Sequence, residues 1–501
     1  MPLRPSRRLF LGGCGALALA AAAPGPAARA ADTPERQLRG LWIASVEHMD
    51  WPPAPGLPED RLRSAYTGLL DAAAALGVNA VFVQVRPTAD AFWPSPFEPW
   101  SHWLTGTPGL DPGWDVLRFL VDAAHARGIA FHAWFNPYRV ALHADPDRLA
   151  PHHPARSHPE WTVAHGGRLY YDPGVPAARA FVEQAVLDAV ARYQVDGVHL
   201  DDYFYPYPTG GEPFADDASF AAYGAGSTDR AAWRRRNVDL LIRELRDLVR
   251  AVRPEAAFGV SPFGVWRNAA TDPAGSATSA FQSYDGLHAD SLGWVRDGLL
   301  DYVAPQLYWH IGHPQADYRT LARWWAAQTA GRDTLLWIGQ SAYRAGAPGQ
   351  AEAWQDPAEL SRHLALNAEL PQIGGDILFS ARNLRADPIG AVARLAADHW
   401  RRPALGPLLP RLAGGTPPSP PRLTASDAGL LLSSGPGTRP PFRYALYHHP
   451  QAHGRTAGTL AAVLPAADAG RPLPVAAAGR YTATAVDRCG RESGASAAVR
   501  Y

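Results

Sequence analysis

The sequence predicts a (β/α)8 TIM barrel, an α/β fold, followed by a small all-β sandwich. Two observations predict the barrel: short runs rich in β-forming residues recur from residue 39 to about residue 382, and longer helical stretches separate them. A third observation, a change of composition near residue 401, predicts the second domain. With 501 residues, of which 47% are apolar, the chain is long enough for two or three domains.

We count eight predicted strands, and eight strands with intervening helices close a barrel. A doubly wound open sheet is the alternative, but no glycine-rich phosphate loop follows the first strand. The strands are Arg39–Ser45, Asn79–Pro87, Ile129–Pro137, Val195–Tyr203, Ala257–Gly264, Tyr302–Trp309, Thr334–Ala342 and Asp376–Arg382. The helices between them are Glu59–Leu76, Asp115–Arg127, Ala177–Tyr193, Asp229–Val252, Ala289–Gly298, Tyr318–Thr329 and Pro357–Asn367.

The predicted domain organisation has four parts. Residues 1–30 are a signal peptide, residues 31–400 form the barrel, residues 401–421 are a Pro- and Gly-rich linker, and residues 422–501 form the sandwich. In the last part, Phe442–His448 and Tyr481–Val486 alternate as strands do. The stretch Tyr481–Ser493 resembles the closing strands of a fibronectin type III domain. We expect an accessory module without a catalytic set.

The first residues predict export. A basic start is followed by an apolar stretch from Leu9 to Ala23 and by small residues around Ala30. Ser6–Leu11 resembles a twin-arginine signal, so we expect a folded protein delivered to the periplasm. Cys14 lies in a lipoprotein-like cleavage site, but the apolar run before it is short, and lipid anchoring is the less favoured interpretation. No later segment has ~18 uninterrupted apolar residues, so no membrane span is expected.

Charge and composition narrow the class of partner. The chain has 47 basic and 47 acidic residues, so no broad attraction to nucleic acid or anionic lipid is expected, and a sugar fits better. The sequence contains no lysine, which excludes Schiff-base, P-loop and kinase-type chemistry. We expect a glycan substrate and neither a cofactor nor a metal.

Polar side chains at the strand ends are the candidates for chemistry, because the carboxyl ends of barrel strands converge on one mouth. Amides, carboxylates, arginines and aromatic rings gather there, and this mixture suits sugar hydroxyls and the apolar faces of sugar rings. The expected substrate-binding residues are Arg86, Trp134, Asn136, Arg139, His199, Tyr203, Trp266, Gln306, Tyr308 and Trp309.

The fourth predicted strand ends in an adjacent pair of carboxylates, Asp201 and Asp202. Glycosidases need two carboxyl groups, one to protonate the leaving oxygen and one to stabilise or attack the developing oxocarbenium ion. Period-two alternation directs Asp201 into the site with His199, and directs Asp202 to the other side unless the loop re-aims it. Asp90, beyond the second strand, is the reserve acid. The expected catalytic residues are therefore Asp201, Asp202 and Asp90.

Several segments together resemble the bacterial glycosyl-hydrolase-like 10 family, which is distinct from the xylanases of similar number. The resemblance implies a barrel in an envelope protein. Some members of the family are lytic glycosidases acting on peptidoglycan glycan strands stripped of their stem peptides. The matching segments are Arg39–Trp42 with Asp50–Pro52, Gln84–Ser101, Phe131–Arg139, Tyr171–Pro176, Val195–Pro206 and Ala304–Trp309.

Two roles for the aspartate pair stay open. Gly197–Asp201 also resembles the fourth-strand motif of α-amylase-type barrels, whose aspartate is the nucleophile, but the fifth strand here carries no glutamate to serve as the acid. Adjacent aspartates also resemble those of enzymes that hydrolyse N-acetylglucosaminides with help from the substrate's acetamido group. In that case Asp201 would orient the acetamide and Asp202 would be the general acid.

The sequence thus predicts an exported glycoside hydrolase that cleaves an envelope glycan, with peptide-free peptidoglycan strands as the expected substrate. Two alternatives are kept: a carbohydrate-binding barrel without turnover, and a metal-dependent polysaccharide deacetylase that would use His199, Asp201 and Asp202. Turnover of purified strands separates the first alternative from an enzyme, and loss of activity with a chelator would identify the second.

Overall fold

Eight parallel strands form a closed barrel in the computed structural model, which describes residues 36–437, 439–450, 458–475 and 477–501. Each strand overlaps one of the eight predicted runs, so the predicted barrel is confirmed. The predicted export signal lies outside the described residues. The barrel strands are β1 (Leu38–Ile43), β2 (Ala80–Arg86), β3 (Ala130–Phe135), β7 (Gly197–Leu200), β8 (Ala257–Val260), β9 (Tyr302–Val303), β10 (Leu335–Gln340) and β11 (Ile373–Leu378).

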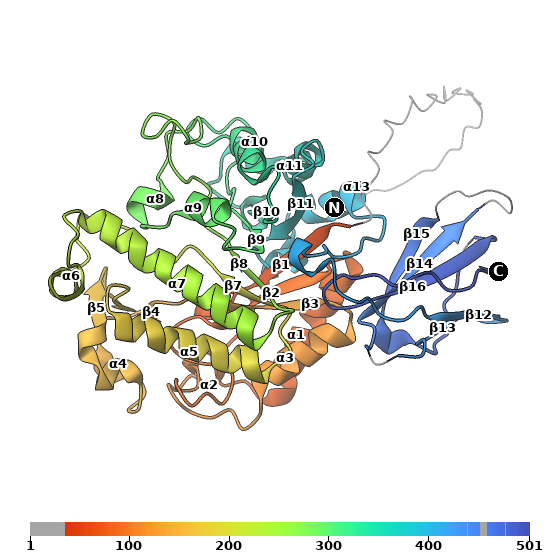
Figure 1. The fold of residues 1–501 in the computed structure, drawn as a ribbon, viewed down its shortest axis with the longest axis horizontal. Helices are drawn as coiled ribbons and strands as arrows, with labels where there is room; N and C mark the ends of the chain where they lie inside the picture. The colour runs from red at the N-terminus through yellow and green to blue at the C-terminus, as the bar shows by residue number, and fades with distance from the viewer. Residues whose placement is uncertain (1–35, 438, 451–457, 476) are drawn as a thin grey trace, which may run out of the picture.

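Helices surround the barrel and return the chain between the strands (Figure 1). Several start at a residue that satisfies free backbone N–H groups: the Asp115 carboxylate accepts from the N–H of Arg118 at 3.1 Å. The longer helices are α1 (Glu59–Ala75), α3 (Val116–Ala126), α5 (Pro176–Arg192), α7 (Arg230–Val252), α10 (Tyr318–Thr329), α11 (Glu359–Ala368) and α13 (Ala391–His399). The shorter ones are α2 (His102–Thr105), α4 (Pro154–Ser157), α6 (Asp217–Tyr223), α8 (Ser283–Gly286), α9 (Ser291–Arg296) and α12 (Arg382–Ala386).

Aromatic side chains fill the interior of the barrel. Trp42, Phe82, Tyr302 and Trp337 pack in one buried cluster, and the rings of Tyr302 and Trp337 stack with their centroids 4.0 Å apart. Such large rings bury much apolar area and leave no open channel through the barrel. The interior is therefore a packed core that lies beneath the mouth.

The C-terminal part forms separate antiparallel sheets, one of β12 (Arg422–Ser426) with β13 (Gly429–Ser433) and one in the order β15-β14-β16-β17. The two alternating runs expected to be strands pair with each other as β14 and β16. The fibronectin type III resemblance stays a prediction. The second sheet contains β14 (Arg443–His449), β15 (Thr459–Pro465), β16 (Arg480–Val486) and β17 (Val499–Arg500).

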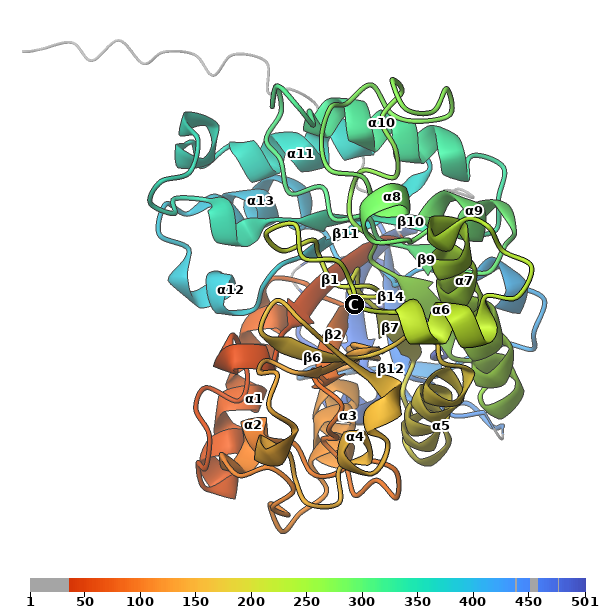
Figure 2. The same ribbon diagram turned by 90° about the vertical axis from the view of Figure 1, so that its left-hand side faces the viewer.

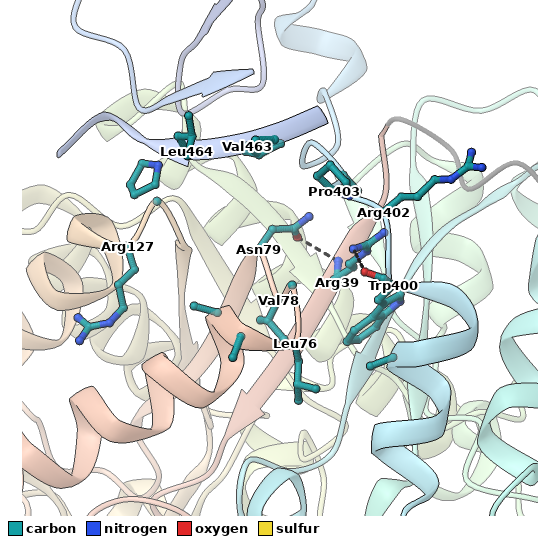
Figure 3. A pocket seen from close by; sticks show the side chains of 18 of the residues that line it. Arg39, Leu76, Val78, Asn79, Arg127, Trp400, Arg402, Pro403, Val463 and Leu464 are labelled. Carbon is teal, nitrogen blue, oxygen red and sulfur yellow. Dashed lines mark hydrogen bonds between the residues drawn. The ribbon is translucent and has the colours of Figure 1, made fainter. Parts of the chain in front are cut away.

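This module lies at the amino-terminal ends of the barrel strands, on the side opposite the mouth (Figures 1 and 2). The buried Arg443 guanidinium donates to the carbonyl oxygen of Asn79 at 2.7 Å and to that of Gly128, which lie just before β2 and β3. A crevice of about 1220 Å³, close to Arg39 and Trp400, separates β15 from the rest of the barrel's amino-terminal face (Figure 3). The module therefore contacts the barrel at the end opposite the mouth.

Residues 401–421, predicted as a linker, also pack against the amino-terminal face of the barrel. Leu405 and Leu409 are buried, and the guanidinium of Arg411 donates from Nε to Oδ1 of Asp301 at 2.6 Å. Pro- and Gly-rich composition indicates irregular backbone, but apolar leucines within such a segment still gain free energy by burial. The segment is therefore docked along the barrel rather than extended as a free spacer.

A buried ion pair fixes the ends of β2 and β3. The side chains of Arg86 and Glu98 have no exposed surface, and Nε of Arg86 donates to Oε2 of Glu98 at 2.7 Å. The same guanidinium donates to the backbone carbonyl oxygens of Asn136 and Pro137, just after β3. This corrects the expectation that Arg86 binds substrate, because protein atoms cover its whole side chain. Its role is to hold the chain on which Asn136 lies.

We predict that Arg86→Met lowers the free energy of unfolding by about 3–5 kcal/mol, because the Glu98 carboxylate would stay buried without its partner. Chemical denaturation measures this difference. Arg61→Met, on the exposed side of α1, is the matched control and should change stability by no more than about 0.5 kcal/mol. Equal denaturation midpoints for wild type and Arg86→Met would contradict a structural role for the pair.

Candidate active site

A cavity of about 340 Å³ opens at the carboxyl ends of the barrel strands. A small sheet in the order β4-β6-β5 lies on this mouth side of the barrel, and Figure 2 looks toward the mouth. Its strands are β4 (Arg139–Ala141), β5 (Thr162–His165) and β6 (Arg168–Tyr171). The cavity brings together these residues predicted from the sequence: Trp134, Arg139, Asp201, Asp202, Tyr203, Gln306 and Tyr308.

Asp201 is the more firmly held of the two aspartates. Oδ2 accepts hydrogen bonds from Nε1 of Trp134, at 3.2 Å, and from Nδ2 of Asn136, while Oδ1 accepts from the backbone N–H of Tyr203 at 3.0 Å. Burial raises the pKa of Asp201, and the positive charge of Arg139 together with these donors opposes the rise. The donors therefore favour the ionised form of this carboxyl group.

A second layer of hydrogen bonds orients Asn136 toward Asp201. The side-chain oxygen of Asn136 accepts from Nε2 of Gln84 at 2.6 Å and from Nη2 of Arg139 at 3.0 Å. Because both donors occupy the oxygen, the amide nitrogen of Asn136 is the atom that faces Asp201. Asn136 is itself fully buried and does not line the cavity, which corrects the expectation that it binds substrate. It positions the carboxylate instead.

Asp202 has other donors and a different pKa. The hydroxyl of Tyr207 donates to its Oδ2, and the amide of Gln306 also stabilises the carboxylate. Burial, and next the charge of Asp201, raise the pKa of Asp202 to about 7. Two adjacent buried carboxyl groups cannot both ionise at low cost, and the better-supported Asp201 keeps its charge. At neutral pH a proton on Asp202 is available to a bound ligand.

The side-chain direction of Asp202 differs from the alternation expected of a strand. β7 ends at Leu200, so both aspartates lie in irregular backbone beyond the hydrogen-bonded ladder. Period-two alternation does not continue there, and both carboxyl groups line the same cavity. The predicted strand Val195–Tyr203 therefore extends too far in both directions.

His199 lies inside the barrel and not in the cavity. Its Nε2 accepts from Nε1 of Trp42 at 3.0 Å, because an indole nitrogen can only donate, and Nδ1 therefore carries the proton that meets the Tyr302 hydroxyl at 3.0 Å. Burial lowers the pKa of His199 well below its usual value, so the ring is neutral. This corrects the expectation of a substrate-binding histidine: the side chain is fully buried and its ring nitrogens are satisfied.

Asp90, Trp266 and Trp309 also lie outside the cavity, contrary to their expected roles. Asp90 is buried near His102, whose Nδ1 lies 3.3 Å from its Oδ2, in a separate pocket. The indole nitrogen of Trp266 donates to Asp290 at 2.9 Å, and Trp309 packs edge-on against a phenylalanine ring with centroids 5.5 Å apart. In each case the loop after the strand turns the side chain toward a protein partner.

Other lining residues are absent from the predicted set. Trp42 and Gln84 belong to segments that carry the family resemblance, which is a signal that could have identified them. Arg168 begins the short strand β6 and Tyr207 lies in the loop after β7, and neither spacing nor periodicity gives a signal at these positions. The additional lining residues are Trp42, Ala44, Val46, Glu47, Met49, Gln84, Leu142, Arg168, Tyr207, Ser261 and Phe379.

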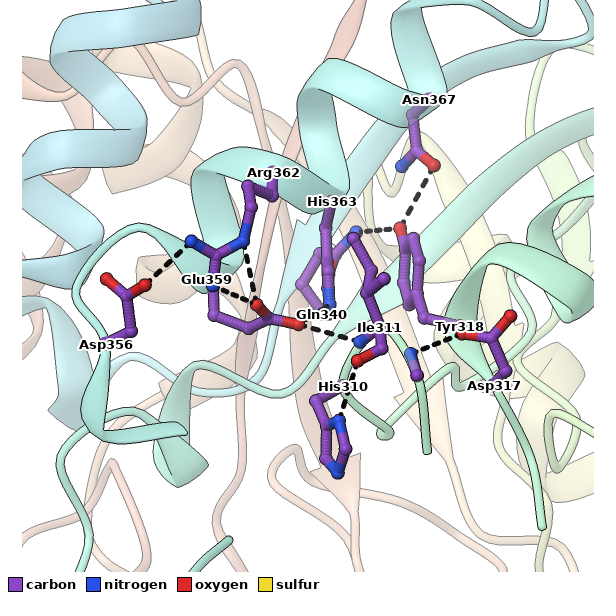
Figure 4. Close-up of polar contacts among 11 residues, drawn as sticks. His310, Ile311, Asp317, Tyr318, Gln340, Asp356, Glu359, Arg362, His363 and Asn367 are labelled. Atoms are coloured by element: carbon purple, nitrogen blue, oxygen red, sulfur yellow. Dashed lines mark hydrogen bonds and ion pairs between the residues drawn. The ribbon is translucent and has the colours of Figure 1, made fainter. Parts of the chain in front are cut away.

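A polar network holds the loop after β9, which carries Tyr308 into the cavity (Figure 4). Oε1 of Glu359 accepts from the backbone N–H of Ile311 at 2.7 Å and lies 3.2 Å from Nε2 of His363. Burial would raise the pKa of Glu359, but His363, the Ile311 N–H and Arg362 lower it to about 2. The ionised carboxylate therefore fastens the loop to α11 from behind the site.

Two general findings concern the described part of the chain. Within it, no group of three or more His, Cys, Asp or Glu side chains is arranged to hold a metal ion. The same residues contain no helix that is long and apolar enough to cross a membrane.

Curated relatives share most of the chain. Glycosyl hydrolase YngK of Bacillus subtilis is 43% identical over 438 residues, which cover 85% of this chain and 85% of the relative. Glycosyl hydrolase DigH of Escherichia coli K12 is 40% identical over 362 residues, which cover 68% of this chain and 82% of the relative. Both names are those of glycosyl hydrolases.

Solved structures with a similar fold are distant in sequence. The glycoside hydrolase domain of PgaB (BpsB) from Bordetella bronchiseptica is 15% identical with a TM-score of 0.45, over 73% of this chain and 99% of that chain. An endo-1,4-beta-mannanase from Rhizomucor miehei is 10% identical with a TM-score of 0.44, over 72% of this chain and 95% of that chain.

The sequence model of the glycosyl hydrolase-like 10 family matches residues 37–356, which include every barrel strand from β1 to β10. The match and the identity to the two curated relatives agree with the resemblance drawn from the strand-end segments. The chain belongs to the glycosyl hydrolase-like 10 family.

Proposed function

We propose that the protein is a glycoside hydrolase of the bacterial envelope in which Asp202 is the general acid and Asp201 the ionised partner. The observation that carries this proposal is the unequal support of the two aspartates. Asp201 has three donors and the Arg139 charge, whereas burial and the charge of Asp201 raise the pKa of Asp202 to about 7. Glycosidases use such a difference to assign an acid and a charged partner.

The pair fits hydrolysis assisted by the substrate's acetamido group. Asp202 gives its proton to the glycosidic oxygen as the bond to C1 breaks, and the acetamide oxygen bonds to C1. Asp201 accepts the acetamide N–H and stabilises the positive charge that develops there. Water then attacks C1, Asp202 takes the water's proton, and the acetamide is released. This route needs no third carboxylate, and it requires a 2-acetamido sugar next to the scissile bond.

The proposed substrate is the glycan strand of peptidoglycan from which the stem peptides have been removed. Both of its sugars carry the acetamido group that the mechanism requires. Aromatic rings of Trp134, Tyr203 and Tyr308 line the cavity, and such rings cover the apolar faces of sugars. The raised pKa of Asp202 favours the hydrolase over a binding barrel without turnover, because a general acid must carry a proton that it can donate.

We also propose that the protein reaches the periplasm by the twin-arginine pathway. The support is the sequence alone: Arg7 and Arg8 stand before an apolar stretch and a small-residue cleavage site. A periplasmic location would bring the enzyme to its proposed substrate.

We predict that Asp201→Asn and Asp202→Asn each lower turnover of peptide-free strands at least ~100-fold, since each removes a charge or a proton used in the reaction. Release of reducing ends measures the rate, and circular dichroism checks the fold. Asp60→Asn, exposed at the start of α1, is the control with the same loss of charge and should keep the wild-type rate. A folded Asp201→Asn variant with near-wild-type turnover would refute the assignment, and failure of the wild type to cleave would favour the binding barrel.

The pH dependence should report the protonation of Asp202. Because the acid must carry a proton in the free enzyme, kcat/KM should fall as pH rises through about 7, the pKa to which burial and Asp201 bring Asp202. The residual rate of Asp202→Asn should lack this fall, because the amide does not titrate. A high-pH limb that is unchanged in Asp202→Asn would show that another group is the acid.

Replacement of Arg7 and Arg8 by lysine should block export, since the twin-arginine pathway requires the arginine pair. Immunoblots of periplasmic and cytoplasmic fractions measure the distribution. Arg4→Lys, which lies before the motif, is the control and should leave export unchanged. A normal periplasmic yield of the double variant would overturn the proposed route.

A further inference from the structure

Arg168 is an exposed cation in the lining of the candidate active site. It lies at the start of β6, in the small sheet on the mouth side of the barrel. Among the described residues, no side chain or backbone group forms a hydrogen bond or ion pair with its guanidinium. The cavity thus contains a positive charge without a hydrogen-bond or ion-pair partner among the described residues.

The other lining cation, Arg139, differs in this respect. Its Nε donates to the carbonyl oxygen of Pro87 at 2.8 Å, its Nη2 donates to Asn136 at 3.0 Å, and its guanidinium lies over the ring of Tyr203. Arg139 is also buried, whereas Arg168 is exposed. Arg139 therefore supports Asp201, and Arg168 is the lining cation that is open to a ligand.

Strand pairing and one loop contact fix the backbone of Arg168 at the mouth. β6 pairs with β5 on one side, where Arg168 faces His165, and with β4 on the other, where Tyr170 faces Arg139. Side chains two residues apart in a strand share a face, so Arg168 and Arg139 lie on the same face of this sheet. The turn before Arg168 is tied to the loop after β7, because the N–H of Gly166 donates to Glu212 at 3.0 Å.

Arg168 lines the cavity together with Tyr203, and its charge acts on that side chain. Burial and the charge of Asp202 raise the pKa of Tyr203 to about 12, and the charges of Arg139 and Arg168 both oppose this rise. Tyr203 follows the aspartates directly, and its backbone N–H binds Asp201. Because Arg168 lines the same cavity as both aspartates, a ligand group that it binds belongs to the ligand that meets them.

We propose that Arg168 binds the free lactyl carboxylate of a muramoyl residue and so selects peptide-free strands. This inference rests on the proposed function. Muramoyl sugars carry a lactyl ether whose carboxyl group is joined by an amide bond to the stem peptide when that peptide is present. Removal of the peptide leaves a carboxylate that is ionised at neutral pH, and guanidinium groups match carboxylates with two parallel hydrogen bonds.

The same contact would discriminate against strands that keep their peptides. An amide at that position has no charge to pair with Arg168, and the chain beyond it must leave through the mouth next to β6. The remaining exposed lining charge, Glu47, lies in the turn after β1 and would repel a carboxylate, which leaves Arg168 as its partner. Selectivity would thus depend on charge at one sugar substituent.

The test compares two substrates and four proteins. The substrates are peptide-free glycan strands and the same strands with the lactyl carboxylates converted to methylamides. The proteins are wild type, Arg168→Gln, Arg168→Lys and the control Arg61→Gln, which removes an exposed arginine of α1 that does not line the cavity. The measured quantity is kcat/KM at low and at high salt.

We expect the wild type and Arg61→Gln to prefer the carboxylate substrate by about tenfold, a size typical of a charge-assisted bidentate contact. Arg168→Gln should lose this preference by slowing on the carboxylate substrate alone, and Arg168→Lys should retain part of it. High salt should reduce the preference of the wild type, because screening weakens an exposed ion pair.

Equal wild-type rates on both substrates, or an equal slowing of both by Arg168→Gln, would overturn the role of Arg168 and leave the proposed hydrolase standing. If the wild type cleaves neither substrate while it is folded, the proposed function fails, and this inference fails with it.

Discussion

The site depends on the cost of placing two adjacent carboxyl groups in one buried cavity. In a medium of low dielectric constant the free energy of ionising both groups is high, because the two negative charges repel each other. The surrounding groups therefore decide which carboxyl group keeps the proton. The charge of Arg139 and three donors support the ionised form of Asp201. At Asp202, Tyr207, Gln306 and the backbone N–H lower the pKa less than burial and the charge of Asp201 raise it. The difference turns two chemically identical side chains into a charged group and an acid with a pKa of about 7.

The rest of the barrel mouth maintains this difference through groups that do not themselves line the cavity. The Arg86–Glu98 pair fixes the chain after β3, on which Asn136 lies, and Asn136 in turn directs its amide nitrogen at Asp201. On the other side, Glu359 fastens the loop that carries Tyr308. These are buried charges with satisfied partners, and such networks hold a site more rigidly than apolar packing alone.

The fold was predictable from the sequence because strand and helix periodicity is a local signal. The position of Asp201 and Asp202 in a cavity at the mouth was predictable because the carboxyl ends of barrel strands converge there. What the sequence could not give is the direction of side chains beyond the ladder. Asp202 enters the cavity because β7 stops at Leu200, while Asp90 and Trp266 find protein partners in their loops. Arg168 comes from a sheet formed by a long excursion between β3 and β7, for which no sequence pattern predicts the position in space.

A crystal structure of Asp202→Asn with a bound peptide-free glycan fragment tests the central claim most directly. We predict that the scissile glycosidic oxygen lies within hydrogen-bond distance, about 2.6–3.2 Å, of the side chain at position 202, and that the acetamide N–H of the adjoining sugar donates to Asp201. A fragment bound outside the cavity, or a glycosidic oxygen that faces another carboxyl group such as Glu47, would contradict it.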